Sequence, residues 1–231
     1  MKVKQEDIII IINCILIGIL FYIIISTPKS NEKIIKENLN SVVEIENILD
    51  ETVISKGTGI VIDTKYIITN YHIVKNNDAK VFINNYNATN KEEVDVVAFA
   101  EKLDLALLKF NNKKLGLNPI KVCNDKQIII GSNIITIGNA KGYGLSFNEG
   151  LISSPIKSLK IDNLYRDVIQ ISVPLVDGDS GGAVINKQNC LVGMMSFKMI
   201  NQINKANEEI SFAIPANTLS KFIKKILINN K

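Results

Sequence analysis

Short segments rich in valine and isoleucine recur between residues 41 and 197 and restrict the folds open to this chain. Glycine, asparagine and aspartate separate them, and no long stretch of helical periodicity intervenes. Many short strands at close spacing predict an all-β barrel or sandwich. The segments are SVVEIENI, GIVID, KYIITN, AKVFIN, VDVVAFA, NIITIG, DVIQISV and CLVGMMSF.

The two ends of the chain have different patterns. Residues 216–228, ANTLSKFIKKILI, follow Pro215 and carry one apolar stripe, which predicts a C-terminal helix. Residues 8–25, IIIIINCILIGILFYIII, approach the ~30 Å thickness of a bilayer core when helical. We therefore predict a membrane anchor over residues 1–25, a single-pass transmembrane helix, and then a short tether or helix over 26–40. A removed signal peptide is the alternative, although its apolar core is usually only roughly 7–15 residues long.

Composition excludes several kinds of function. The net charge is +4, and the lysines are scattered with no compact basic run among aromatic residues, so nucleic-acid binding is not expected. With one histidine and no zinc-type cysteine spacing, we expect no metal and no cofactor. Cys14 lies in the apolar run. For Cys123 and Cys190 we favour two buried free thiols over a disulfide.

The glycine-rich stretch VDGDSGGAV, residues 176–184, has two interpretations. It fits a tight turn between strands, because glycine allows positive φ angles. It also fits a nucleophile, Ser180, surrounded by backbone amides. A serine hydroxyl needs an adjacent base, and His72 is the only histidine. Asp104 begins the apolar run LALLKF, where a carboxylate is costly unless something such as an imidazole N–H binds it.

Three segments in the order His, Asp, Ser resemble the trypsin-like serine proteases, specifically the HtrA/Deg branch: GTGIVIDTKYIITNYHIV (57–74), LDLALLKF (103–110) and GDSGGAVI (178–185). Weaker matches are IITIGNAKGYGLSFNEGLIS (134–153), DVIQISV (167–173) and SFAIPANTL (211–219). The resemblance covers roughly residues 40–228. It implies a protease domain over 41–231, with two six-stranded antiparallel β-barrels of the chymotrypsin-like kind, about 41–125 and 126–215, and then the C-terminal helix.

The resemblance also implies roles for individual residues. His72 is the general base, Asp104 orients it, and Ser180 is the nucleophile. The oxyanion hole uses the backbone amides of Gly178 and Ser180, with that of Asp179 beside them. Nine small or apolar residues then line the substrate pocket and favour small or medium aliphatic side chains before the cleaved bond: Pro174, Leu175, Val176, Met195, Ser196, Phe197, Ser211, Phe212 and Ala213.

Two acids depart from the family pattern. The HtrA branch usually has N-P-G-N-S-G-G-P where this chain has V-D-G-D-S-G-G-A. Asp177 adds negative charge near the oxyanion site unless it points to solvent. Asp179 matches the digestive proteases, in which this acid pairs with a freed N-terminal ammonium. Here we expect it to bind backbone N–H groups or a lysine, and one hypothesis is that the loop is inactive until something orders it.

Taken together, these features predict a membrane-tethered serine endopeptidase that cleaves unfolded or extended proteins through an acyl-enzyme. The alternative is a catalytically latent or inactive module that binds extended polypeptides. The expected partners are protein or peptide substrates and a membrane, contacted through residues 8–25. The resemblance implies an extracytoplasmic protease domain and allows a homo-oligomer, which is commonly a trimer in that family. Most HtrA proteins carry a PDZ domain after the protease domain, whereas here we expect none.

Overall fold

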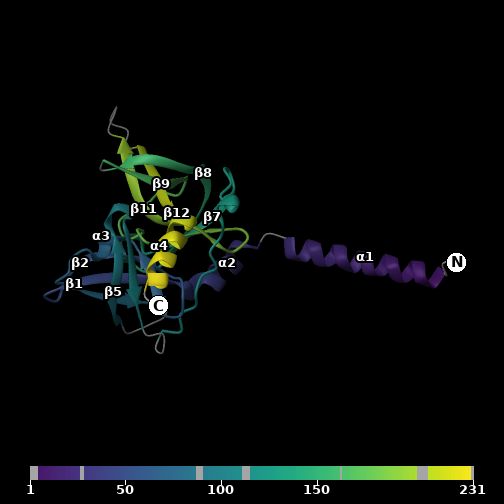
Figure 1. Cartoon of the computed structure of the whole chain (residues 1–231), viewed down its shortest axis with the longest axis horizontal. Helices are drawn as coiled ribbons and strands as arrows, with labels where there is room; N and C mark the ends of the chain where they lie inside the picture. The colour runs from purple at the N-terminus through teal and green to yellow at the C-terminus, as the bar shows by residue number, and fades with distance from the viewer. Residues whose placement is uncertain are drawn as a thin grey trace.

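Two closed β-barrels form the body of the computed structural model, which describes residues 5–26, 29–86, 91–110, 115–161, 163–201 and 208–229 (Figure 1). The first barrel has the spatial order β1-β2-β3-β6-β5-β4 and the second β10-β11-β12-β9-β8-β7. Within both barrels the paired strands are antiparallel. The predicted fold of two six-stranded barrels is confirmed.

The strands fall on the valine- and isoleucine-rich segments of the sequence. Those of the first barrel are β1 (Val42–Leu49), β2 (Thr52–Val61), β3 (Tyr66–Thr69), β4 (Lys80–Asn84), β5 (Glu92–Ala100) and β6 (Leu105–Lys109). Those of the second are β7 (Asn133–Gly138), β8 (Ser146–Ile161), β9 (Leu164–Ile171), β10 (Ala183–Asn186), β11 (Leu191–Asn201) and β12 (Glu208–Pro215).

The helices are α1 (Gln5–Ser26), α2 (Asn31–Asn38), α3 (Tyr71–Val74) and α4 (Ala216–Asn229). Four short 3-10 turns accompany them: η1 (Leu39–Ser41), η2 (Glu101–Leu103), η3 (Asp125–Gln127) and η4 (Ala140–Gly142). Helix α4 confirms the predicted C-terminal helix. It starts directly after Pro215, and its buried residues Leu219 and Phe222 belong to the core.

Apolar packing joins the two barrels into one unit. Each barrel has an interior cluster of its own, and a third cluster lies between the barrels. That third cluster combines Ile68 and Leu107 from the first barrel with Ile137 and Met194 from the second, all of them completely buried. Because interiors of this kind are close-packed, the barrels present their facing edges at a fixed spacing.

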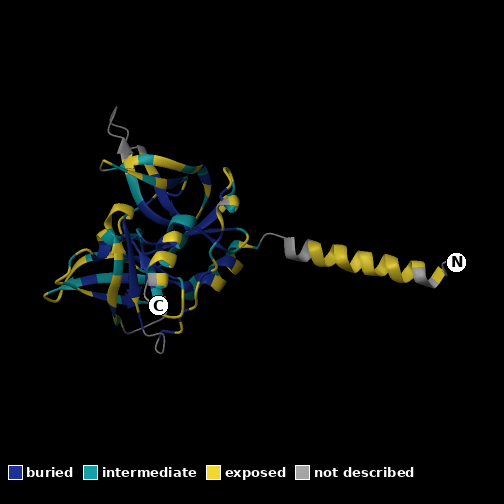
Figure 2. Cartoon of the chain, in the orientation of Figure 1, coloured by how far each residue is buried: buried dark blue, intermediate teal, exposed yellow. Residues whose placement is uncertain are grey.

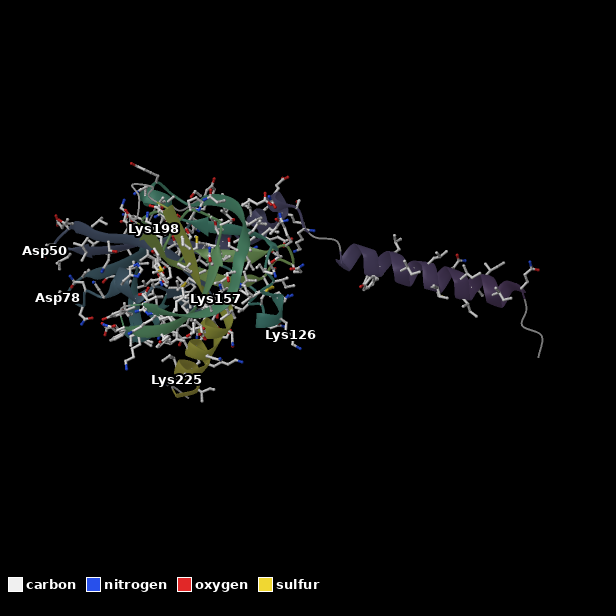
Figure 3. All side chains as sticks on the ribbon, turned by 90° about the horizontal axis from the view of Figure 1, so that it is seen from above. Asp50, Asp78, Lys126, Lys157, Lys198 and Lys225 are labelled. Carbon is white, nitrogen blue, oxygen red and sulfur yellow. A yellow bond between two sulfur atoms is a disulfide. The ribbon has the colours of Figure 1, made fainter. Side chains whose placement is uncertain are left out.

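Helix α1 stands apart from the barrels in two perpendicular views (Figures 1 and 3). Its large apolar side chains between Ile8 and Tyr22 are exposed at successive positions and therefore on every side (Figure 2). In the part of the chain that the structure describes, no helix combines the length and apolar character needed to cross a membrane. The prediction of a helix at residues 8–25 is confirmed, but its membrane-spanning character is not supported. Residues 1–4 of the predicted anchor lie outside the described residues.

Part of the predicted tether, residues 26–40, is a packed helix. Ser30 caps α2 by accepting a hydrogen bond from the Lys33 amide at 3.3 Å, and Ile34 is completely buried. Asn38 donates to the Asn189 side chain of the second barrel at 2.5 Å. Residues from 31 onward are therefore part of the globular body.

The structure joins Cys123 and Cys190 in a disulfide, with the two Cα atoms 5.3 Å apart. The expectation of two free thiols is wrong. The linker between the barrels runs beside the start of β11: the Cys123 amide donates to the Leu191 carbonyl at 2.9 Å, and the Leu191 amide to the Lys121 carbonyl at 2.7 Å. These backbone hydrogen bonds bring the two cysteines together. A contact between segments so far apart in the sequence cannot be predicted from a short-range pattern. Cys14 is an exposed free cysteine on α1.

Candidate active site

His72 and Asp104 meet at one end of the first barrel. His72 lies in α3, directly after β3, and Asp104 lies between η2 and β6 in the left-handed region, at φ 54°. The His72 ring nitrogen Nδ1 is 2.9 Å from Asp104 Oδ2, and the His72 amide donates to Oδ1, also at 2.9 Å. Because a carboxylate only accepts hydrogen bonds, Nδ1 carries the proton and Nε2 is left as an acceptor.

Two further side chains hold the buried Asp104 carboxylate. Asn70 Nδ2 donates to Asp104 Oδ2 at 3.0 Å, and Ser196 Oγ donates to the same oxygen at 3.1 Å. Asp104 is only 7% exposed, and these hydrogen bonds offset the cost of burying its charge. The sequence prediction missed Asn70, and it placed Ser196 in the substrate pocket. One feature of the sequence could have identified Asn70 as a site residue: its polar side chain lies between a buried strand and the single histidine.

Ser180 lies on the loop between β9 and β10, and its hydroxyl donates to the Ser196 carbonyl at 2.9 Å. Ser196 thus contacts Ser180 through its backbone and Asp104 through its side chain. The loop also binds the first barrel, because the Thr58 amide donates to the Ser180 carbonyl at 2.8 Å. Ser196 therefore links Ser180 to Asp104 and, through it, to His72, although these three residues are distant in the sequence. No hydrogen bond joins Ser180 to His72 within the described residues.

The chain before Ser180 forms a tight turn. The Asp179 amide donates to the Val176 carbonyl at 3.1 Å, and Gly178 has a φ of 95°, a combination typical of a type II turn. A Cβ on Gly178 would lie 2.1 Å from the Asn139 carbonyl oxygen, so this position requires glycine. Because its amide is used within the turn, Asp179 is not available as the oxyanion-hole donor that the sequence predicted.

Two backbone amides in this turn have no acceptor. Among the described residues, neither the Gly178 N–H nor the Ser180 N–H donates a hydrogen bond. The Lys141 amide donates to the Asp177 carbonyl at 2.7 Å, so this carbonyl oxygen points toward the β7–β8 loop. The Gly178 N–H belongs to the same planar peptide and therefore points in the opposite direction. Thr58 Oγ1 fixes the next peptide by donating to the Gly178 carbonyl at 2.8 Å. The turn thus leaves two donors for an anionic oxygen.

The two unusual acids have different surroundings. The Asp177 side chain is 87% exposed and lies 3.3 Å from Lys141 Nζ, so it points to solvent. Asp179 is only 3% exposed, and its Oδ2 accepts from the Val176 amide at 3.0 Å. This backbone N–H is one of the two partners that we expected. Burial raises the pKa of Asp179, and the Val176 hydrogen bond opposes that rise in part.

A cavity of about 630 Å³ opens beside His72 and Asp104, and Ser180 is not among its lining residues. His72, Asp104 and Phe197 line it, together with residues of β8, β9 and β11. Other residues of the predicted pocket lie deeper. Leu175, Met195 and Ala213 belong to the core of the second barrel. Ser211 Oγ accepts from the Leu175 amide at 3.1 Å, and Phe212 stacks on Phe197 with ring centroids 5.1 Å apart. Pro174 is exposed, and Val176 is half-buried in the turn.

The raised pKa of Asp179 predicts how stability depends on pH. Above the ordinary value of 3.8, the folded protein binds this proton more tightly than the unfolded chain, so the free energy of unfolding decreases as pH rises through the raised pKa. Asp179→Asn removes the charge and keeps an oxygen acceptor for the Val176 amide. We expect this variant to be more stable than the parent at neutral pH, and the difference to vanish as pH falls toward 3.8.

Urea unfolding of the full chain across this pH range measures the difference. Asp177→Asn is the matched control, because its side chain is 87% exposed and should change stability little at any pH. Parallel pH profiles for the parent and Asp179→Asn would contradict the prediction.

Comparison with known proteins agrees with this geometry. Residues 57–194 match the model of the trypsin-like peptidase domain. A DegP-like protein of Buchnera aphidicola, named a "probable periplasmic serine endoprotease", is 34% identical over 175 residues, or 74% of this chain and 36% of the relative. An HtrA-like serine protease of Staphylococcus aureus is 30% identical over 191 residues, or 76% of this chain and 24% of the relative. The chain thus spans about a quarter to a third of the length of these curated relatives.

Solved structures show the same fold. A serine endoprotease from Yersinia pestis has a TM-score of 0.72 and 25% identity, and the match covers 89% of this chain and 70% of that one. The HtrA-type protease AlgW, as a variant with a tripeptide, has a TM-score of 0.73 at 22% identity, with 86% of this chain and 64% of that one covered, which shows likeness of fold alone. From its matched domain and its relatives, the chain belongs to the trypsin-like peptidase family, in the HtrA/DegP-like group.

Proposed function

We propose that this protein is a serine endopeptidase that hydrolyses peptide bonds of unfolded or extended proteins. One observation carries the proposal: His72, Asp104 and Ser180 are linked through Ser196, beside a turn whose Gly178 and Ser180 amides have no acceptor among the described residues. This arrangement supplies a base, an orienting carboxylate, a nucleophile and donors for a developing oxyanion.

In the proposed mechanism, Asp104 holds His72 with Nε2 as the acceptor. Ser180 Oγ turns from the Ser196 carbonyl toward Nε2, gives up its proton, and attacks the substrate carbonyl carbon. The carbonyl oxygen becomes negative and accepts hydrogen bonds from the Gly178 and Ser180 amides. His72 then donates its proton to the leaving amine, which leaves an acyl-enzyme on Ser180. A water molecule, deprotonated by His72, hydrolyses that ester and regenerates the hydroxyl.

The state of the Asp179 loop bears on whether the protease is latent. Among the described residues, the turn is held by Val176, Lys141 and Thr58. These contacts support an enzyme that is active without prior cleavage, in place of a loop that must first be ordered.

A serine-directed fluorophosphonate tests the catalytic assignment. We expect the full chain to be labelled at once, without a lag, and Ser180→Ala to remain unlabelled. Asp104→Asn should lower kcat by a factor on the order of 10⁴, because the amide cannot stabilise the His72 tautomer and the imidazolium. Labelling that persists in Ser180→Ala would refute the nucleophile, and an unlabelled parent would favour the alternative of an inactive module that binds extended polypeptides.

We propose that small or medium aliphatic side chains are preferred before the cleaved bond. The residues of the segments around Ser180 that lie outside the core include Pro174, Val176 and Phe197, all apolar, and the one acid nearby, Asp177, points to solvent. Digestion of a peptide library should therefore give cleavage after valine or alanine and not after lysine or arginine. Cleavage after arginine alone would contradict the preference. Ser180→Ala is the control for contaminating proteases.

We also propose that α1 attaches the protease domain to a membrane on the extracytoplasmic side. The apolar side chains from Ile8 to Tyr22 are exposed at successive positions, which favours contact with lipid over water. The Cys123–Cys190 disulfide is typical of an oxidising compartment, and the Buchnera relative is named as periplasmic. The trimer stays a prediction.

Cell fractionation followed by mass spectrometry tests the attachment. We expect the intact chain in the membrane fraction, resistant to an alkaline wash. A variant with alternate apolar residues of α1 changed to serine should move to the soluble fraction. Recovery of the parent as a soluble chain that lacks α1 would instead indicate a removed signal peptide.

A further inference from the structure

Arg166 is the only arginine in a chain with 27 lysines and arginines. It lies on β9, opposite Leu159 of β8, and lines the cavity that also contains His72 and Asp104. Its Nε atom is buried and has no hydrogen-bond partner. Within the described residues, its guanidinium also forms no ion pair. Although the Nε atom itself is closed to a ligand, the Arg166 side chain lines the cavity and contributes to it a positive charge that no acid of the described residues neutralises.

The charges around the cavity favour an anionic ligand. Its cationic lining residues are Lys75, Lys160, Arg166 and Lys198, and its acidic ones are Glu101 and Asp104. The Asp104 carboxylate is already occupied by His72, Asn70 and Ser196, and Lys198 (Figure 3) is paired with Glu209 at 2.9 Å. Lys75, Lys160 and Arg166 form no ion pair in the described part of the chain.

The free backbone edge in this cavity indicates that the ligand is an extended peptide. Strand β11 pairs with β12 as far as Asn201, but its pairing with β10 on the other edge ends at Met194. In the described residues, the edge of β11 at Phe197–Met199 is therefore free for an extended peptide, which can add to it as a further strand. Because Ser180 Oγ contacts the Ser196 carbonyl, a peptide on this edge has one end at the nucleophile.

We propose that Arg166 binds the carboxylate of an aspartate or glutamate side chain in the substrate, at a position removed from the cleaved bond along β11. The proposal rests on the proposed function and adds a substrate class: extended segments with an acidic residue near an aliphatic cleavage site. A guanidinium suits this task better than an ammonium, since its planar N–H groups match the two carboxylate oxygens. Arg166 thereby selects the substrate without taking part in bond cleavage.

Paired peptides test the proposal. Both peptides of a pair contain a valine–alanine bond as the cleavage site. They differ at one position, where one peptide has glutamate and the other glutamine, and different pairs place this residue at different positions before or after the bond. Acetylated and amidated ends ensure that only the side chain supplies a carboxylate. For one position we expect the full-length parent to favour glutamate in kcat/KM by about tenfold or more. Arg166→Gln should lose this preference, Arg166→Lys should keep part of it, and Arg166→Glu should favour lysine at that position.

Lys221→Gln is the matched control, because it removes one positive charge from an exposed residue of α4, outside this cavity. It should keep the glutamate preference. Recognition of a terminal carboxylate would instead give equal rates for the blocked glutamate and glutamine peptides and a preference for peptides with free C-termini. That result, or a glutamate preference retained in Arg166→Gln, would overturn the proposal.

Two further measurements separate this proposal from the proposed function. Fluorophosphonate labelling of Ser180 should be equal in the parent and Arg166→Gln. If no peptide is cleaved, fluorescence anisotropy of the paired peptides with Ser180→Ala measures binding alone. Tighter binding of glutamate that is lost in Ser180→Ala/Arg166→Gln would support the carboxylate site although the chain is no protease. Equal binding of both peptides, or binding of neither, would overturn the site.

Discussion

The buried carboxylate of Asp104 is the constraint on which the rest of the site depends. A charge almost removed from water must be surrounded by donors, and here they come from both barrels. His72 and Asn70 belong to the first barrel and Ser196 to the second. The carboxylate is therefore satisfied only when the barrels are packed together. Because Ser180 contacts Ser196 within the second barrel, the same packing also sets Ser180 close to Asp104.

The turn at Gly178, the proposed oxyanion hole, is fixed by both backbone and side-chain contacts. Its peptides are fixed from outside by the Lys141 amide and the Thr58 hydroxyl, and from inside by Asp179. In the digestive proteases a chain end neutralises the equivalent acid, whereas here the Val176 backbone N–H binds a carboxyl whose pKa is raised by burial. The turn thus keeps its shape through neighbouring loops, which explains how prolines can be absent from it.

The sequence predicted what depends on local pattern. Alternating valine- and isoleucine-rich segments located the strands, and glycine and serine spacing located Ser180, because both reflect short-range backbone requirements. It could not predict contacts between distant segments. The Cys123–Cys190 bond depends on the linker lying beside β11, and the contact of Ser196 with Asp104 depends on the packing of the barrels. That Arg166 Nε has no hydrogen-bond partner within the described residues likewise appears only once the side chains are placed in space.

The disulfide has a consequence for β11, the strand that carries Ser196. It ties the linker between the barrels to the start of β11, the strand that carries Ser196 and the edge proposed to receive substrate. The cross-link spans 67 positions, which restricts the unfolded chain strongly. While the bond is intact, the linker and the start of β11 remain joined, so the strand that carries Ser196 is held to the linker by a covalent bond as well as by backbone hydrogen bonds. The redox state of the compartment therefore determines how firmly this strand is attached to the linker.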